Sequence, residues 1–161
     1  MAANVFLKFT PEEKGESKQA GYEGQIEILS FSWGVSQAAG FSYGEGGGVS
    51  KANVQDLSVS FRQNPSSPKL MQSCALGKHY DDALLTCLKA AGEGQEKYLE
   101  ITLTDVIISS YQTGGSGDDI PIESLSLNFA KVKEEYFKQD DKGVTKSAAI
   151  GQYNQQTGKK D

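Results

Sequence analysis

The sequence predicts a mainly β protein with antiparallel strands and one short α-helix. Two long alternating segments between Tyr98 and Tyr136 flank a Gly/Ser/Asp-rich connector, and each exceeds the usual strand length of about 5–6 residues. Further alternating segments occur along the chain without crossover helices between them, which favours antiparallel connections among about seven or eight strands. Strands this long must coil, close into a barrel or extend into a neighbouring molecule. The pattern therefore indicates an architectural protein.

The N-terminal part predicts two strands with a charged, glycine-punctuated loop between them. The first strand spans Asn4–Thr10, the loop covers Pro11–Gly21, and the second strand spans Gln25–Gln37. The second strand has one bulky face and one small polar face, made respectively of Leu29, Phe31, Trp33 and Val35 and of Ser30, Ser32, Gly34 and Ser36. We expect the bulky face to lie in the core. Before Leu29 the alternation slips by one residue, which indicates a β-bulge or a strand buried on both faces.

Residues 38–52 form an unusually long connection that contains five glycines. Loops of this length are often functional or disordered. Three apolar side chains, Phe41, Tyr43 and Val49, occur in this segment. Two interpretations remain open: they form a docking surface, or they fold back onto their own sheet.

The middle of the chain predicts a strand, the helix and another short strand. Alternation over Val54–Gln63 predicts the first strand, and Leu84–Ala90 predicts the second. Helix signals lie between them: an N-cap serine, a proline at the first helical position, one apolar face and a terminating glycine. The residues concerned are Ser67, Pro68, Leu70, Met71, Cys74, Ala75 and Gly77.

The C-terminal part predicts the two long strands, framed by turns at Gly92–Gly94 and Gln139–Gly143. In the second long strand the alternation of Leu125, Leu127 and Phe129 changes phase before Val132. This change predicts a bulge or bend near Ala130–Lys131, where the strand leaves its own barrel. The remaining Val144–Asp161 is polar, and we expect Ile150 and Tyr153 to fix a final short strand.

Composition argues for one domain over residues 1–161 and against several classes of partner. The formal net charge is −5 and the lysines are scattered among carboxylates, so no basic stripe predicts a nucleic-acid partner. No apolar run approaches the roughly 18 residues that span a bilayer, so no membrane insertion is expected. The N-terminus lacks the basic and apolar regions of a signal peptide. Cys74 and Cys87 are expected to be reduced and buried.

The sequence offers no catalytic or metal-binding constellation. His79 is the only histidine, so a Cys–His pair or a Ser–His–Asp triad would have to use it, and no G-x-S-x-G motif is present. Metal motifs of the C-x-x-C, H-E-x-x-H or EF-hand type are absent, and the glycine clusters at residues 44–48 and 114–117 do not match a phosphate loop. We therefore predict no catalytic residue, no metal site and no cofactor.

The chain resembles the Hcp family, the haemolysin-coregulated proteins that form the inner tube of bacterial type VI secretion systems. Six segments carry this resemblance in order along nearly the whole chain: residues 15–37, 46–61, 67–80, 95–117, 123–136 and 150–160. The resemblance implies a small antiparallel β-barrel of two packed sheets with one flanking helix. It also implies hexameric rings that stack into a tube inside a contractile sheath, capped by a VgrG spike and expelled with effector proteins.

Three sets of residues are then expected to make contacts in such an assembly. Ser30, Ser32 and Gly34 are expected to line the lumen and contact cargo, although this face could also meet outside solvent. A ring-stacking loop is expected at Phe41, Tyr43, Gly46, Gly47, Gly48 and Val49. A peripheral loop resembling one at the ring periphery of the family is expected at Gln112, Thr113, Gly114, Gly115 and Ser116, with a mobile hairpin tip as the alternative.

Two other functions remain open from the residues alone. One is a secreted effector or hydrolase built on a β-barrel, and the other is a ligand-binding barrel that works as a monomer. A tube subunit is expected to assemble in the bacterial cytoplasm and to leave by the type VI route without a signal peptide. A particle near six subunits favours the tube subunit, whereas a strict monomer favours the alternatives.

Overall fold

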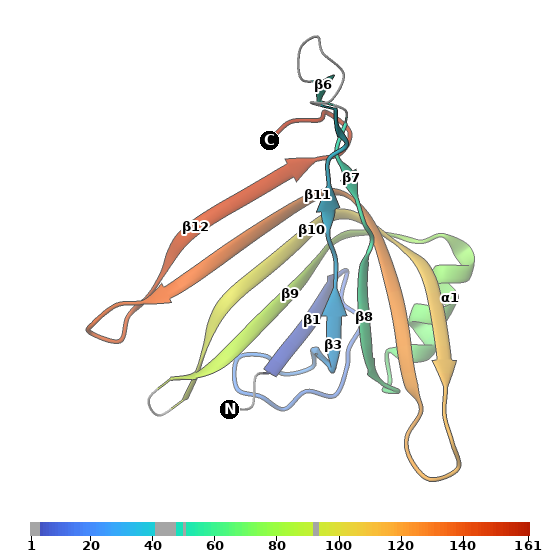
Figure 1. The fold of residues 1–161 in the computed structure, drawn as a ribbon. Helices are drawn as coiled ribbons and strands as arrows, with labels where there is room; N and C mark the ends of the chain where they lie inside the picture. The colour runs from blue at the N-terminus through green and yellow to red at the C-terminus, as the bar shows by residue number, and fades with distance from the viewer. Residues whose placement is uncertain (1–3, 41–47, 50, 92–93) are drawn as a thin grey trace.

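Eight strands form one antiparallel sheet that curls into a nearly closed barrel in the computed structural model (Figure 1). The structure describes residues 4–40, 48–49, 51–91 and 94–161. The strands are β1 (Asn4–Thr10), β2 (Ile26–Ile28), β3 (Ser30–Ser32), β4 (Val35–Ser36), β5 (Ala39–Gly40), β6 (Gly48–Val49), β7 (Asn53–Val54), β8 (Leu57–Arg62), β9 (His79–Ala91), β10 (Gly94–Gly114), β11 (Ile122–Gln139) and β12 (Thr145–Asn154), and the helix is α1 (Ser67–Leu76). The predicted mainly β class with one short helix is confirmed for these residues.

The sheet order is β2-β1-β9-β10-β11-β8-β3, with β12 also paired to β11. One apolar cluster draws residues from six strands of this sheet and from α1, so the two halves of the sheet pack face to face. Strand β8 shows the underlying pattern: Leu57, Val59 and Phe61 are buried, while the residues between them point outward. The first strand has the bounds that its alternation predicts.

The barrel closes at the segment that was predicted as one strand over Gln25–Gln37. In the structure β2 pairs with β1, and β3 pairs with β8. Leu29 lies between them, and its backbone N–H donates to the Ser60 carbonyl at 2.8 Å. The change of partner explains the slip in alternation, but it turns the Leu29 side chain outward, where 49% of it is exposed. The prediction that Leu29 is a core residue is therefore wrong; Val35 is also exposed, whereas Phe31 and Trp33 pack against the core.

The long strands β10 and β11 pair with each other along most of their length, as their alternation predicts. Strand β11 pairs on its other side first with β8, up to Leu127, and then with β12 from Lys131 onward. The phase change at Ala130–Lys131 coincides with this change of partner. The register to β10 is continuous there, so a bulge at that position is wrong; it shifts instead between Ile108 and Ser110. The backbone distortion opposite Ala130 falls on β10, at Asp105 (φ 55°).

Helix α1 packs against β10 (Figure 1). Fewer of its apolar residues are buried than the sequence predicts. Leu70 is fully buried, but Met71 and Ala75 are exposed. The N-cap residue is Ser66 rather than Ser67, because the helix begins at Ser67, so Pro68 is its second residue rather than its first. The Ser67 hydroxyl accepts a hydrogen bond from the Asn64 backbone N–H at 3.0 Å. Gly77 ends the helix with φ 65°, a left-handed conformation that glycine adopts without strain.

Two strands extend further than the sequence pattern predicts. Strand β9 is thirteen residues long and begins at His79, because its first residues pair with β10 although they do not alternate clearly. Strand β12 has ten residues, and Tyr153 packs against the core as expected. Ile150 does not fix this strand to the barrel, since 56% of it is exposed.

A strap over residues 11–25 is tied to the barrel by a buried polar cluster. The Tyr80 hydroxyl donates to Glu13 Oε1 at 3.0 Å and lies 2.8 Å from Ser73 Oγ. Lys78 Nζ lies 3.3 Å from the same carboxylate oxygen. Desolvation by burial is the main cause that raises the pKa of Tyr80 to about 12; the Ser73 hydrogen bond opposes it, and the hydrogen bond and charge of Glu13 add to it. The cluster thus links the strap to α1 and β9.

We expect Tyr80→Phe to lower the free energy of unfolding by about 1–3 kcal/mol, because it leaves Glu13 with one fewer buried partner. The raised pKa favours the neutral phenol in the folded state, so this contribution is complete below pH 10 and is lost as the pH rises towards 12. Chemical unfolding between pH 7 and pH 12 measures both effects. Tyr22→Phe is the control, since the Tyr22 ring stacks on Phe6 and its hydroxyl has no hydrogen-bond partner among the described residues. Equal losses in the two variants would contradict the assignment.

Candidate functional site: a serine-lined face of the barrel

Small hydroxyl side chains cover the outer face of four adjacent strands: β3, β8, β11 and β10. The register aligns them in two rows across the sheet, Ser30–Ser60–Ser124–Gln112 and Ser32–Ser58–Ser126–Ser110. In β3, β8 and β11 each serine alternates with a more buried apolar residue, so these serines point away from the core. In β10 the register shift between Ile108 and Ser110 brings Ser110 and Gln112 into the same rows. Seven of the eight aligned residues are therefore serines.

The two rows line a shallow hollow of about 410 Å³. Ser30 Oγ and Ser60 Oγ are 2.5 Å apart, so these two hydroxyls hydrogen bond across the strands. None of the residues that line the hollow is charged, and none is a histidine or a cysteine. Hydroxyls both donate and accept hydrogen bonds and rotate to suit a partner. This face can therefore make weak, adaptable polar contacts, and it lacks the acid, base and activated nucleophile that catalysis needs.

The structure brings together only part of the predicted lumen set. Ser30 and Ser32 lie in the two rows, whereas Gly34 lies beyond the end of β3 and outside the hollow. A Cβ at Gly34 would lie 3.2 Å from Gln55 Oε1, so the glycine permits the close approach of Gln55, whose backbone N–H donates to the Gly34 carbonyl. Its role is local packing.

Sequence reasoning missed the other members of the rows. The alternating serines of the two neighbouring strands, Ser58 with Ser60 and Ser124 with Ser126, carried the signal, but only the pairing shows that they join Ser30 and Ser32. Gln112 was predicted in the peripheral loop, and the structure places it in the hollow. Together with Thr113 and Gly114 it belongs to β10, and only Gly115 and Ser116 lie in the connection to β11.

The ring-stacking loop falls mostly outside the described residues. Phe41, Tyr43, Gly46 and Gly47 are not described, and Gly48 and Val49 form strand β6. Strand β6 pairs with β5, and β7 pairs with β4, so the loop is carried on a two-stranded ribbon that projects from the barrel (Figure 1).

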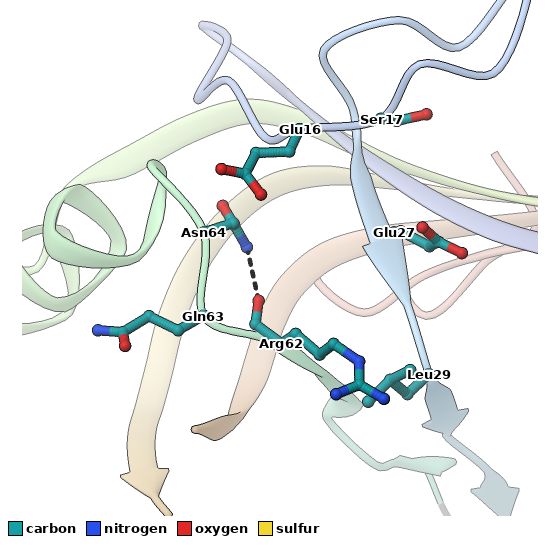
Figure 2. Close-up of a pocket in the computed structure, with 7 residues that line it drawn as sticks. All are labelled: Glu16, Ser17, Glu27, Leu29, Arg62, Gln63 and Asn64. Carbon is teal, nitrogen blue, oxygen red and sulfur yellow. Dashed lines mark hydrogen bonds between the residues drawn. The ribbon is translucent and has the colours of Figure 1, made fainter. Parts of the chain in front are cut away.

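A second hollow, of about 250 Å³, lies at the seam of the barrel, between β2 and the end of β8 (Figure 2). Its lining includes the exposed carboxylates Glu16 and Glu27, the exposed Leu29 and Arg62. Figure 2 shows the Arg62 guanidinium next to Leu29 and the hydrogen bond from the Asn64 side chain to the Arg62 carbonyl, which is 3.0 Å long. Arg62 Nη1 also lies 3.3 Å from Asp119 Oδ2, an exposed pair that contributes little stability.

Neither cysteine forms a reactive site. Both thiols are free; Cys87 is fully buried as predicted, but the prediction that Cys74 is buried is wrong, because Cys74 is partly exposed on α1. Burial raises the pKa of Cys87, against a smaller lowering by its hydrogen bond with Tyr98, so the thiolate is disfavoured. Among the described residues, no cluster of histidine, cysteine or acidic side chains has the composition of a metal site. The described helix is too short and too polar to cross a membrane.

One buried acid is held at the end of the core beside the serine rows. Glu123 is fully buried, and its Oε2 accepts a hydrogen bond from the Tyr111 hydroxyl, while its Oε1 has no partner in the described structure. We expect Tyr111→Phe to lower the free energy of unfolding by about 1–3 kcal/mol, because it removes the only partner that the described residues give this carboxyl group. Adding Glu123→Leu should recover most of this loss in chemical unfolding. Two additive losses would contradict the pairing.

The curled antiparallel sheet with its single short helix defines a mainly β, barrel-like protein. A family model described as "Type VI secretion system effector, Hcp" matches residues 6–136, which is most of the chain. The chain is similar to protein Hcp1 of Pseudomonas aeruginosa, with 46% identity over 145 residues, covering 89% of each chain. The chain belongs to the Hcp family, and it is a tube subunit of the type VI secretion system.

Solved structures agree with this membership. A structure described as that of a type six secretion system protein shares 27% identity, with a TM-score of 0.90 over 99% of this chain and 100% of the other. The crystal structure of Hcp1 from Salmonella typhimurium shares 31% identity, with a TM-score of 0.78 over 98% of this chain and 97% of the other. These likenesses confirm the predicted family and the barrel, and they support ring and tube assembly by a secreted structural protein.

Proposed function

We propose that this chain forms hexameric rings whose lumen is lined by the two serine rows and shelters effector proteins. The observation that carries this proposal is the uncharged, hydroxyl-covered face across β3, β8, β11 and β10. Small side chains leave a channel open, and rotating hydroxyls hydrogen bond with varied cargo. A charged lining would select cargo of one sign, whereas this face does not. The chain acts without catalysis, as carrier and tube wall.

The partners that follow are an effector in the lumen, a contractile sheath around the tube and a VgrG spike at its end. Assembly takes place in the bacterial cytoplasm, and the loaded tube is then expelled. The exposed hairpin tip at Gly115 and Ser116 is a candidate contact with the sheath or baseplate. The ribbon that carries residues 41–47 is a candidate contact with the next ring.

We expect Ser32→Gln to reduce effector binding and export at least about tenfold, a loss of roughly 1.4 kcal/mol, while rings still form. Glutamine adds bulk to the second serine row without adding charge. Ser32→Ala is the matched control, because it removes the hydroxyl without adding bulk and should retain most of the export. Co-purification of effectors with the ring and secretion assays measure the two variants. Normal binding and export of every effector by Ser32→Gln would contradict the lumen assignment.

A further inference from the structure

Strand β12 is exposed on both of its faces. Its central residues 146–152 are all exposed, and they include the apolar run Ala148, Ala149 and Ile150. Tyr136, the neighbour of Ala149 on β11, is also 46% exposed. A strand of an antiparallel sheet normally buries at least one face. This strand and the adjoining part of β11 therefore present an apolar surface that the chain's described residues leave open.

The outer edge of β12 also presents unpaired backbone groups. The Gln155 N–H donates to the Ala130 carbonyl at 2.8 Å, so alternate residues Tyr153, Gly151 and Ala149 face β11. Gln152 and Ile150 then direct their backbone N–H groups outward. The Asn154 N–H agrees with this alternation, because it points outward and bonds to the Lys159 carbonyl. Among the described residues the outward N–H groups of Gln152 and Ile150 have no partner, and the tail after β12 reaches the Gln152 end of this edge, where the Gln152 side chain donates to the Lys160 carbonyl at 2.8 Å.

Natural proteins usually protect such edges with prolines, bulges or several charges. Here Lys146 is the only charged residue of the ten, and it lies near one end of the strand. The single register irregularity, opposite Tyr136 and Phe137, lies outside the stretch that holds Ile150 and Gln152. The edge is therefore suited to pairing with another chain.

The charges of the molecule indicate what covers this edge. Residues 145–161 contain three lysines and one aspartate, whereas residues 11–29, the strap and β2, contain two lysines and five glutamates, of which all but the buried Glu13 are exposed. Glu16 and Glu27 line the hollow at the barrel seam, and neither forms an ion pair in the described structure. Leu29, in the same hollow, adds an exposed apolar side chain. A second copy of the chain thus offers an acidic surface with an apolar centre to a basic edge with an apolar centre.

We propose that the outer edge of β12, with the basic segment that follows it, docks on the acidic seam of a second copy around Glu16, Glu27 and Leu29. The contact joins two different surfaces of the chain, so it is heterologous and closes into a ring when the rotation permits. The inference rests on the proposed ring assembly and assigns the surfaces that make it. Pairing at the edge supplies backbone hydrogen bonds, and the opposite charges select the head-to-tail arrangement.

The first test separates the backbone edge from the side chain. Ile150→Pro removes an outward N–H while leaving the bonds between β12 and β11, whereas Ile150→Thr keeps the N–H and shortens the apolar side chain. Circular dichroism checks that both variants fold, and sedimentation measures assembly. We expect Ile150→Pro to need at least about ten times more protein than Ile150→Thr to form rings. Equal assembly of the two variants would overturn the proposal.

The second test uses the charges and does not depend on a proline. One variant combines Glu16→Lys with Glu27→Lys, and the other combines Lys159→Glu with Lys160→Glu. Each variant alone brings like charges together at every contact, so we expect rings to be lost in each. In an equal mixture the two variants alternate around the ring with opposite charges in contact, so rings should return. Rings in both separate variants, or none in the mixture, would overturn the proposed contact.

The wild-type protein distinguishes this inference from the proposed function. If the wild-type chain forms rings and the variants above form them equally well, only the proposed β12 contact is wrong. A wild-type chain that stays monomeric at every concentration would remove ring assembly and the β12 contact together.

Discussion

Deletion of Gly44–Val49 is expected to leave hexameric rings intact and to impair the growth of stacked tubes. The deletion removes residues 44–47 and strand β6, and it leaves the eight-stranded sheet of the barrel untouched. The segment contains apolar residues on a glycine-rich loop, which suits a contact with the adjacent ring. At about 0.15 M salt the Debye length is roughly 8 Å, so repulsion between the acidic rings is screened and contact chemistry decides stacking.

Negative-stain microscopy measures this result directly, as the length of tubes at matched protein concentration. A second variant replaces Phe41 and Tyr43 with serine, which keeps the length of the loop and removes two apolar side chains. We expect this variant to form shorter tubes as well, because the apolar side chains are the proposed anchors. Tubes of normal length in the deletion variant would show that the loop does not join the rings.

Phe61→Ala is expected to lower the free energy of unfolding by about 3–5 kcal/mol, a large share of the roughly 5–15 kcal/mol that stabilises an ordinary domain. Phe61 is fully buried at the end of β8 and belongs to the one apolar cluster that both halves of the sheet share. Its removal leaves a cavity at the place where β8 holds the barrel closed. Ring formation should decrease in parallel, because β8 pairs with both β3 and β11 and so positions both serine rows.

Ile122→Ala is the control for this core substitution. Ile122 is 42% exposed and pairs with the residue that follows Phe61 on β8, so its truncation should cost less than about 1 kcal/mol. Chemical unfolding of the two variants gives the comparison. A loss below about 1 kcal/mol for Phe61→Ala would show that the two halves of the sheet do not share one core.

The regular strands were predictable because their alternation depends only on local sequence. Strand β1, the long pair β10 and β11, and the face of β8 all follow a clear period of two. The barrel closure was not predictable, because Leu29 faces outward only as a result of a change of partner between β1 and β8. The strand pattern records that a slip occurs, whereas the tertiary pairing decides which side chains it exposes.

The candidate site was predictable in part for the same reason. The small polar face of β3 is visible in the sequence, but its extension over three more strands depends on the register between segments far apart in the chain. Gly34 shares the alternation of Ser30 and Ser32, and the chain turns away before it can share their surface. Ile150 was predicted to fix the final strand, and its exposure shows that it does not, because no described residue of the chain covers it.

The central claim is that this barrel is the repeating unit of a ring. Negative-stain microscopy of the wild-type protein, combined with a mass measurement on the same sample, tests it most directly. We expect rings with an open centre and a mass near six times the 17.3 kDa of the chain, with some rings stacked end to end. A uniform population of 17.3 kDa monomers, without rings at any concentration, would contradict the claim.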